Sequence, residues 1–514
     1  MIFISADFIF INGLYVIGFL FASLIIQKEK NYFISIVSIF IGIFLFFIIG
    51  FFMILIFGII YWKVFLLIGL ILSSVFLILI YLNNSLKKRM IGLFTSLFVL
   101  NFLIFIFNKY DFNLFCGDTF ILTRNALNFS SNSRNIAPFA NWGPFYPVIQ
   151  YINNELGNVY SISLQPLFLL SFTLIFQKVT YKALIASDVN KMASLLTSIS
   201  SSLVVITSPI FLNITLLIHT NAIFTYYLFM FVAFYWLGEA KKEKGYYYLC
   251  YLFLFAGSAT RVESSIYLTI FFLCMLFKNS LHYESLKFLF TNQRKKMIQG
   301  QTNKKIEELS HLDLLVAQSF FLVMGTWYAT QYLLGLTSEI LNPSKSLFLA
   351  LLYIGLALSF FAHRIVLFSF IRNNFLTITL IILLIFLPIL LIMFNDIFSK
   401  NKNTIINNLS TDYWKGVRIF TVASLSFLCF RQRKRILLDS SILIAFGLMV
   451  LSIFIFGLFR IPYNNGLYDS SNRLLVALIP IAIFYLTLKV NVSQPLPFLH
   501  KVNSWFKRRN LNTE

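Results

Sequence analysis

The chain has 514 residues, of which 59% are hydrophobic and only 12% are charged, and its mean hydropathy is +0.82. This composition excludes a soluble globular protein and indicates an integral membrane protein. The net charge of +22 comes mainly from short loops between apolar stretches, so it indicates membrane topology and attraction to anionic lipid headgroups rather than nucleic-acid binding.

Long apolar stretches recur from one end of the chain to the other. Since a membrane span needs about 20 mostly apolar residues, they predict an all-α, polytopic protein with about 15 transmembrane helices. The stretch 33–60 is longer than one span requires, which indicates tilt or an extension along the membrane surface. The predicted spans are 8–26, 33–60, 64–82, 91–107, 162–177, 192–208, 222–238, 246–260, 264–278, 313–335, 346–362, 375–394, 417–430, 440–458 and 474–490.

The distribution of Lys and Arg predicts the orientation, because basic residues in short loops are retained in the cytoplasm. With the N-terminus outside and the C-terminus cytoplasmic, most of the 41 Lys and Arg fall on the cytoplasmic side. The first apolar stretch has no basic residues before it and is followed by Lys28 and Lys30, so we expect a retained span rather than a cleaved signal peptide. The expected location is the plasma (inner) membrane.

Polarity divides the chain into six segments. Residues 108–161 form the longest external polar stretch, in which we expect short amphipathic helices and the catalytic chemistry. The segments are N-terminal membrane helices (1–107, about four spans), the external catalytic loop (108–161), core membrane helices (162–278), a basic cytoplasmic loop (279–312), C-terminal membrane helices (313–490) and a basic cytoplasmic tail (491–514).

Asp118 is the acidic residue of most interest in the external loop. It follows Gly117 and precedes an amphipathic stretch, 119–129, which predicts a short helix along the membrane surface. One interpretation is that Asp118 only caps this helix. The other is general base catalysis: a carboxylate that takes the proton of an attacking hydroxyl accelerates transfer by about 10²- to 10⁴-fold. A lipid phosphate leaving group then needs fixed positive charge, which Arg supplies.

Four short segments together resemble the GT-C superfamily of polyprenyl-phosphate-sugar-dependent glycosyltransferases, and within it the family-39-like membrane enzymes. They are Gly117–Leu127, Trp142–Pro147, Ala259–Glu263, and Asn472–Arg473 entering a span with Pro480. Two features differ from the family pattern. Four predicted spans precede the acidic loop where the family commonly has one, and His219-Thr220-Asn221 stands where many members carry an acidic residue.

The resemblance implies a GT-C-like fold and an inverting transfer of a sugar from a polyprenyl-phosphate donor to a lipid, glycan or protein acceptor on the extracytoplasmic face. Asp118 would be the general base. The donor phosphate would bind Arg261, Arg473 and Arg124, and the substrate-binding residues would be Tyr146, Trp142, His219, Asn221 and Glu263.

Each of these residues also has a purely structural interpretation. Arg261 and Glu263 could form an ion pair that closes a tight turn, although ionisable residues between apolar stretches favour function. Arg473 could anchor a span at the headgroup level. Tyr146 and Trp142 suit an interfacial aromatic belt, and His219 suits a polar residue satisfied inside a helix bundle.

No cofactor is expected. The sequence has no phosphate-binding loop, dinucleotide fingerprint or zinc-hydrolase motif, and its four cysteines lack metal-ligand spacing, so neither a metal nor a required divalent cation is indicated. Two other functions stay open. A polysaccharide polymerase would use a polyprenyl-diphosphate glycan, and a lipid or glycan transporter would need charged or broken helices along a path through the membrane.

Overall fold

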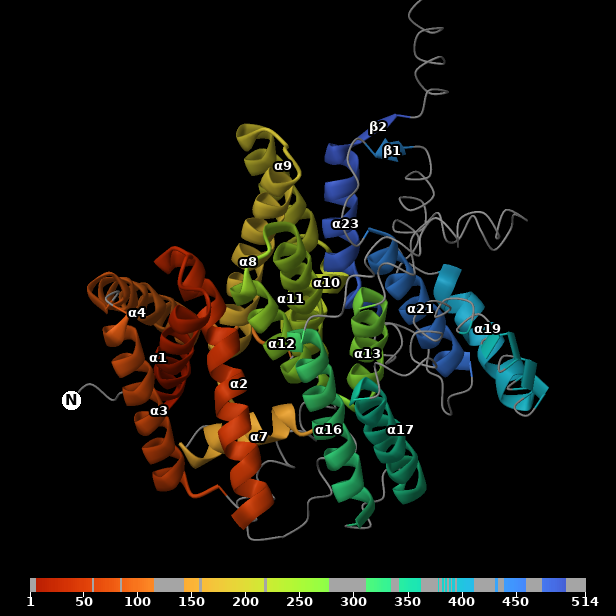
Figure 1. Cartoon of the computed structure of the whole chain (residues 1–514), viewed down its shortest axis with the longest axis horizontal. Coiled ribbons are helices and arrows are strands. Elements are labelled where there is room, and N and C mark those ends of the chain that lie inside the picture. The colour runs from red at the N-terminus through yellow and green to blue at the C-terminus, as the bar shows by residue number, and fades with distance from the viewer. Residues whose placement is uncertain are drawn as a thin grey trace, which may run out of the picture.

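The computed structural model describes residues 6–57, 60–83, 86–114, 143–156, 160–216, 220–276, 311–333, 342–361, 378, 381–382, 384–385, 388–389, 391–392, 395–410, 430–432, 439–458 and 474–495. Within them the protein is helical apart from one pair of short strands, and the helices stand roughly alongside one another (Figure 1). The all-helical prediction is confirmed for these residues.

The first four helices are α1 (Ala6–Ile25), α2 (Asn31–Phe57), α3 (Trp62–Leu82) and α4 (Leu86–Lys109). Gly18 and Gly42 let the backbones of α1 and α2 touch. A Cβ at Gly18 would lie 1.9 Å from the carbonyl oxygen of Ser38, and one at Gly42 would lie 1.8 Å from that of Leu14. Close approach through small residues is a common way for membrane helices to associate.

The central helices follow the stretch that was predicted to be an external loop. They are α7 (Phe145–Glu155), α8 (Leu164–Ala186), α9 (Lys191–Ile206), α10 (Pro209–Leu216), α11 (Thr220–Lys241), α12 (Lys244–Ser258) and α13 (Val262–Leu276). Helix α11 forms the centre of the core, since its residues from Thr220 to Glu239 are all buried. Helix α7 instead lies crosswise to α2 and α16 (His311–Leu333) (Figure 1).

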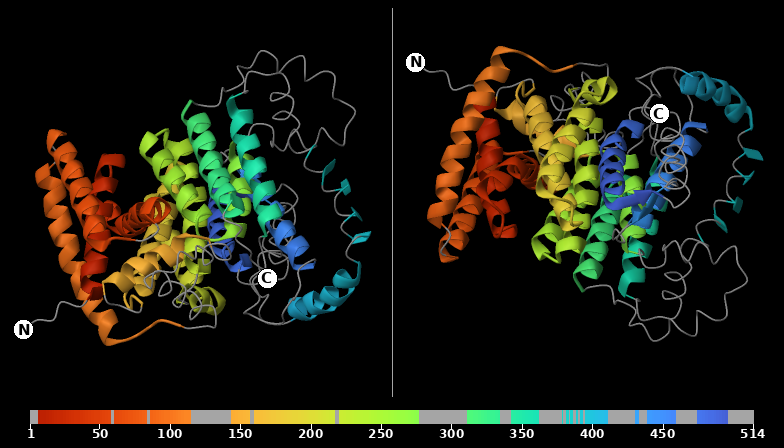
Figure 2. Two further views of the ribbon diagram at one scale, coloured as in Figure 1. Left: turned by 90° about the horizontal axis from the view of Figure 1, so that it is seen from below. Right: turned by 90° about the horizontal axis from the view of Figure 1, so that it is seen from above.

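The C-terminal half adds α17 (Pro343–Phe361), α19 (Asn395–Ser410), α21 (Asp439–Leu458) and α23 (Ile479–Val492). Figure 2 shows α16 and α17 side by side. Strands β1 (Phe430–Gln432) and β2 (Ser493–Pro495) pair antiparallel, with Arg431 opposite Gln494. This strand pair connects the end of the predicted span 417–430 to the start of the predicted C-terminal tail, 491–514.

Seven described helices are long and apolar enough to cross a membrane: α1, α2, α3, α4, α8, α11 and α17. Helices α9 and α10 make an eighth span if they count as one, although they meet at a 68° bend. By length and composition these helices indicate a multi-pass membrane protein. They are fewer than the 15 predicted, partly because α12 and α13 have only 15 residues each, shorter than a typical span.

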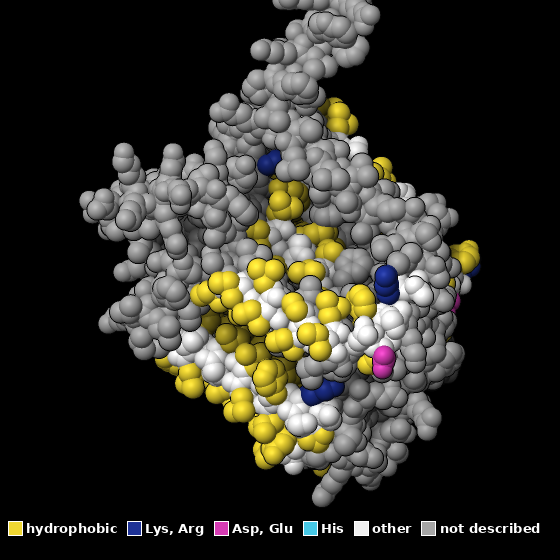
Figure 3. Space-filling view, turned by 90° about the vertical axis from the view of Figure 1, so that its right-hand side faces the viewer, with side chains coloured by type: hydrophobic (Ala, Val, Ile, Leu, Met, Phe, Trp, Pro, Cys, Tyr) yellow, Lys and Arg dark blue, Asp and Glu magenta, His cyan; other side chains and the backbone are white. Residues whose placement is uncertain are grey.

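Apolar side chains cover the outside of the bundle. Leu67, Leu70 and Ile71 of α3 and Phe98 and Phe105 of α4 are more than half exposed. A second apolar face lies over the C-terminal helices, where Figure 3 shows hydrophobic side chains with few charged ones among the described residues. Such broad apolar surfaces suit contact with lipid.

Helix direction defines two ends of the bundle. The α7 end contains α7 and the first residues of α1, α8 and α11, and the basic end contains the connections 26–30 and 242–243 and the last turn of α8. At the basic end, Lys182 Nζ lies 2.5 Å from a carboxylate oxygen of Glu29, which also accepts a hydrogen bond from the Tyr246 hydroxyl. Arg89 donates to the carbonyl of Glu29 at 2.9 Å.

Candidate functional site

Two segments singled out in the sequence meet at the α7 end. Gly143 has φ of +75°, and a Cβ there would lie 2.6 Å from the carbonyl oxygen of Ala259 and 2.8 Å from the amide nitrogen of Arg261. Two residues later, the Phe145 amide donates to the same Ala259 oxygen at 3.1 Å. Only glycine combines this backbone conformation with such a close approach. The chain before α7 is therefore fixed directly against the turn between α12 and α13.

Arg261 is the buried cation of this turn, with a relative exposure of 3%. One guanidinium nitrogen donates to the side-chain oxygen of Asn221 at the start of α11. Its Nε lies 3.3 Å from one carboxylate oxygen of Glu263, and a terminal nitrogen lies 3.5 Å from the other. The structure thus brings Asn221 together with Arg261 and Glu263, which follow it by 40 and 42 positions.

The geometry of this group suits an exchangeable anion. The Arg261–Glu263 distances are longer than the 2.7–2.9 Å typical of a strong charge-assisted bond, and the Glu263 side chain is 23% exposed. Glu263 is thus the more exposed member of the pair, whereas the guanidinium, which is permanently charged, is buried. A phosphate offers such a guanidinium two acceptor oxygens at once.

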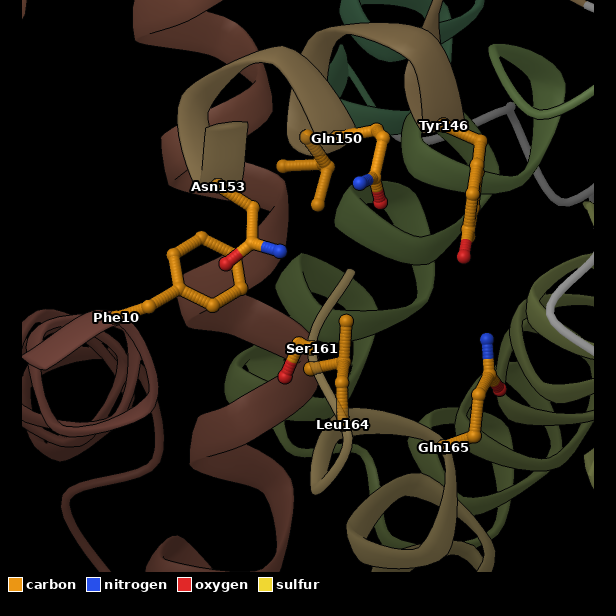
Figure 4. A pocket seen from close by; sticks show the side chains of 8 residues that line it. Phe10, Tyr146, Gln150, Asn153, Ser161, Leu164 and Gln165 are labelled. Carbon is orange, nitrogen blue, oxygen red and sulfur yellow. The ribbon is translucent and has the colours of Figure 1, made fainter. Parts of the chain in front are cut away.

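Tyr146 lies in the first turn of α7 and is buried, with 4% exposure, which does not fit an interfacial belt position. Its ring therefore presents little surface on which a sugar could stack. Instead it lines a small hollow, together with side chains from α1, from elsewhere in α7 and from the start of α8 (Figure 4). Tyr146 contributes to this hollow rather than to an open aromatic platform.

An apolar groove of about 260 Å³ runs along α13 from Ile266 to Cys274. Ile266, one helical turn after Val262, is its first lining residue on α13, and α17 and α21 supply the other walls. The residues from α17 and α21 are Leu352, Tyr353, Leu356, Leu448, Leu451, Ser452 and Ile455. A hydrocarbon chain is the ligand that such a surface favours.

Five predicted site residues, Asp118, Arg124, Trp142, His219 and Arg473, lie outside the described residues. The described chain nevertheless borders the site on both sides of 115–142. The Leu114 amide donates to the carbonyl of Leu216 at the end of α10, at 3.0 Å, and Gly143 lies against Arg261. Both flanks of that stretch therefore lie near the α10–α11 connection or the Arg261 turn.

A carboxylate that the sequence analysis did not select connects α1 to α8. Asp7 accepts a hydrogen bond from the Ser161 hydroxyl, and its other oxygen accepts from the Ser163 amide at 3.2 Å. Asp7 is only 4% exposed. Its position at the edge of an apolar stretch was the available signal, because a carboxylate there needs a specific partner.

Asp111 is a second carboxylate that the sequence analysis did not select, and it links the two ends of the predicted external loop, 108–161. Asp111 accepts from the Asn113 side chain at 2.7 Å and from the Tyr160 hydroxyl at 3.0 Å. The Asn113 amide also donates to the carbonyl of Ile162 at 2.8 Å. Burial, and then the neighbouring Asp111, raise the pKa of Tyr160 above its ordinary value. These contacts fix where the loop leaves and re-enters the bundle.

Among the described residues, no group of three or more His, Cys, Asp or Glu could hold a metal ion. Cys250 and Cys274 are both buried. The candidate site therefore consists of a buried arginine and a small polar hollow at one end of a helical bundle, together with an apolar groove along α13. No protein-family model, curated protein or solved structure matches this chain.

Proposed function

We propose that the protein is an inverting glycosyltransferase that moves a sugar from a polyprenyl-phosphate donor to an acceptor on the extracytoplasmic face of the membrane. In the proposed step, an acceptor hydroxyl attacks the anomeric carbon and gives its proton to Asp118. The bond between that carbon and the phosphate oxygen breaks, and polyprenyl phosphate leaves. Arg261 stabilises the negative charge of this leaving group.

The observation that carries the proposal is the position of Arg261. It lies at the start of α13, buried against Asn221 and held loosely by Glu263, and the apolar groove follows the same helix from Ile266 onward. A phosphate attached to a long hydrocarbon needs these two surfaces in this order. The end of the bundle opposite the Glu29–Lys182 pair would face the extracytoplasmic side.

Chain length keeps Asp118 within reach of the end of α10. It is four residues beyond Leu114, which bonds to the end of α10, so its Cα is at most about 14 Å from that of Leu114. Arg124 and Arg473 are proposed as further phosphate ligands. Trp142, His219 and Asn221, with Glu263 and the Tyr146 hydroxyl, are proposed to contact the sugar or the acceptor.

The test is transfer of a labelled sugar from a synthetic polyprenyl-phosphate donor by the purified protein in lipid nanodiscs. Arg261→Ala should weaken donor binding by about tenfold or more, because a buried charge-assisted contact is lost. Lys63→Ala is the matched control, since Lys63 is an exposed cation at the same end of the bundle, at the start of α3. Equal donor affinity in the two variants would remove the phosphate role of Arg261.

A lipid or glycan transporter is the second candidate, and the break between α9 and α10 favours it. These helices meet at 68° around Thr207, Ser208 and Pro209, and broken helices form the binding sites of many transporters. Reconstituted vesicles distinguish the two functions. Movement of a labelled lipid-linked glycan across the bilayer with no new glycosidic bond would support the transporter, and transfer without such movement would support the enzyme.

A further inference from the structure

The small hollow near Arg261 is lined by uncharged polar groups. Helix α7 supplies Gln150 and Asn153, the start of α8 supplies Gln165, and Ser161 precedes that helix. The remaining lining residues are Phe10, Tyr146, Ile149 and Leu164. Figure 4 shows the carboxamides of Gln150, Asn153 and Gln165 around the same space, with the Tyr146 hydroxyl facing Gln165.

Gln165 is the group that points to a ligand. Its side chain is 1% exposed, yet neither its amide nitrogen nor its amide oxygen has a hydrogen-bond partner among the described residues. Buried polar atoms in proteins almost always have a partner, and leaving one without a bond is costly. A ligand that enters the hollow and both accepts from and donates to this amide would supply the partners.

The polar groups that line the hollow favour a hydroxyl group as the ligand. The Ser161 hydroxyl already donates to Asp7, so its oxygen offers only an acceptor to the hollow. The Gln165 amide offers two donors and one acceptor. A hydroxyl can use both kinds of group at once. None of the described residues that line the hollow is charged, so a charged ligand group would be buried among them without compensation.

The size and position of the hollow narrow the ligand further. It has room for a group about as large as one water molecule, which fits a hydroxyl or hydroxymethyl arm but not a whole sugar ring. The start of α7 links it to the Arg261 turn, because Tyr146 lines the hollow and the amide of the neighbouring Phe145 donates to the Ala259 carbonyl. A sugar whose phosphate lies at Arg261 therefore has this polar hollow close by.

We propose that the hollow formed by Gln150, Asn153, Ser161 and Gln165 is a hydroxyl-binding subsite that selects a neutral sugar. This assignment rests on the proposed glycosyltransferase function for the identity of the ligand as a sugar. It adds the substrate class, a sugar that is uncharged at the position entering the hollow, and it names Gln165 as the residue that recognises it.

The experiment measures binding of hexyl glucoside, a neutral hexoside, to the protein in nanodiscs by saturation-transfer NMR. Gln165→Met keeps the size of the side chain but removes its hydrogen bonds, so the affinity should fall about tenfold. Gln331→Met is the matched control, because Gln331 is an equally buried glutamine in α16, outside the hollow. Its variant should bind hexyl glucoside as the wild type does. If Gln165→Met does not fold, Gln150→Met on the opposite wall carries the same expectation.

Unchanged affinity in the Gln165 variant, or an equal loss in the Gln331 variant, overturns the subsite. Competition then identifies which sugar enters. Displacement of hexyl glucoside by a polyprenyl-phosphate hexose, but not by polyprenyl phosphate alone, supports a subsite for the donor sugar, and binding of both together supports one for the acceptor. If hexyl glucoside binding depends on Gln165 but the protein transfers no sugar, the subsite is supported and the glycosyltransferase function is rejected. If the protein transfers sugar but binding does not depend on Gln165, the function is supported and the subsite is rejected.

Discussion

The two ends of the bundle each hold a buried ion pair, and the pairs differ in how tightly they close. At the basic end, Glu29 is held by Lys182 at 2.5 Å and by the Tyr246 hydroxyl, with both charged side chains at or below 14% exposure. At the α7 end, the closest Arg261–Glu263 distance is 3.3 Å and the Glu263 side chain is 23% exposed. The first pair is closed, and the second is open toward solvent.

This difference separates a structural role from a binding role. The closed pair joins the α1–α2 connection to α8 and α12, and neither the hollow nor the apolar groove is lined by its residues, so it holds helices together. The open pair lies at the start of α13, the helix that lines the apolar groove from Ile266 onward, and we propose that its arginine exchanges a carboxylate for a ligand anion. Three predictions test this contrast.

The largest expected effect is at the closed pair. Lys182→Met leaves the Glu29 carboxylate buried without its cation and also removes the ammonium 3.9 Å above the Phe33 ring, so the free energy of unfolding should fall by about 3–5 kcal/mol. Denaturant titration in detergent micelles measures it. The double variant Glu29→Gln/Lys182→Met should recover most of the loss, and an unfolding midpoint unchanged in the single variant would show that the pair is not closed.

A smaller effect is expected where α7 meets the Arg261 turn. Gly143→Ala places a Cβ against the Ala259 carbonyl at a positive φ, which should cost about 1–2 kcal/mol in backbone strain and displace the turn, so donor affinity should fall too. Gly355→Ala in α17 is the control, because a Cβ there meets nothing within 4 Å. Identical stability and donor binding in the two variants would mean that this contact does not shape the site.

The smallest effect is a change in pH dependence at the basic end. Burial acts to raise the pKa of Glu29, but the Lys182 charge and the hydrogen bonds from Lys182 and Tyr246 together bring it below its ordinary value of 4.5. The wild-type contribution to stability is thus present above that value and is lost as the pH falls through the lowered pKa. In Lys182→Met, burial dominates and raises the pKa, so acidification should stabilise the variant. Unfolding midpoints of the wild type and of Lys182→Met, measured on both sides of pH 4.5, show whether acidification destabilises the first and stabilises the second. Parallel pH profiles of the two proteins would contradict this prediction.

The sequence predicted the helices better than their arrangement. The apolar stretches at 8–26, 64–82 and 91–107 correspond to α1, α3 and α4 with shifts of a few residues, because uninterrupted apolar runs leave few alternatives to a helix. The span at 162–177 was predicted nine residues too short at its end. Helix α8 continues to Ala186 because the charges of its two lysines are stabilised. Lys178 lies over the Tyr32 ring, and Lys182 lies over the Phe33 ring and pairs with Glu29.

The site was predictable only in part, for a physical reason. Residues such as Arg261 and Glu263 stand out because charge between apolar stretches is expensive. Gly143 meets the backbone of residues 259–261, more than a hundred positions away, and the Asn221 side chain accepts from Arg261 across 40 positions. No local sequence pattern encodes such contacts. Gln165 carries no signal at all, since a glutamine near the start of a span is ordinary until its partners are known.

The most direct test of the central claim compares the same substitution at two aspartates of the external loop. The measurement is the initial rate of labelled sugar transfer from a polyprenyl-phosphate donor in nanodiscs. Asp118→Asn should lower the rate by about 10²- to 10⁴-fold with donor binding retained, because a base is lost. Asp111→Asn, whose oxygen can still accept from Asn113, should retain most of it. Wild-type turnover in Asp118→Asn would contradict the account.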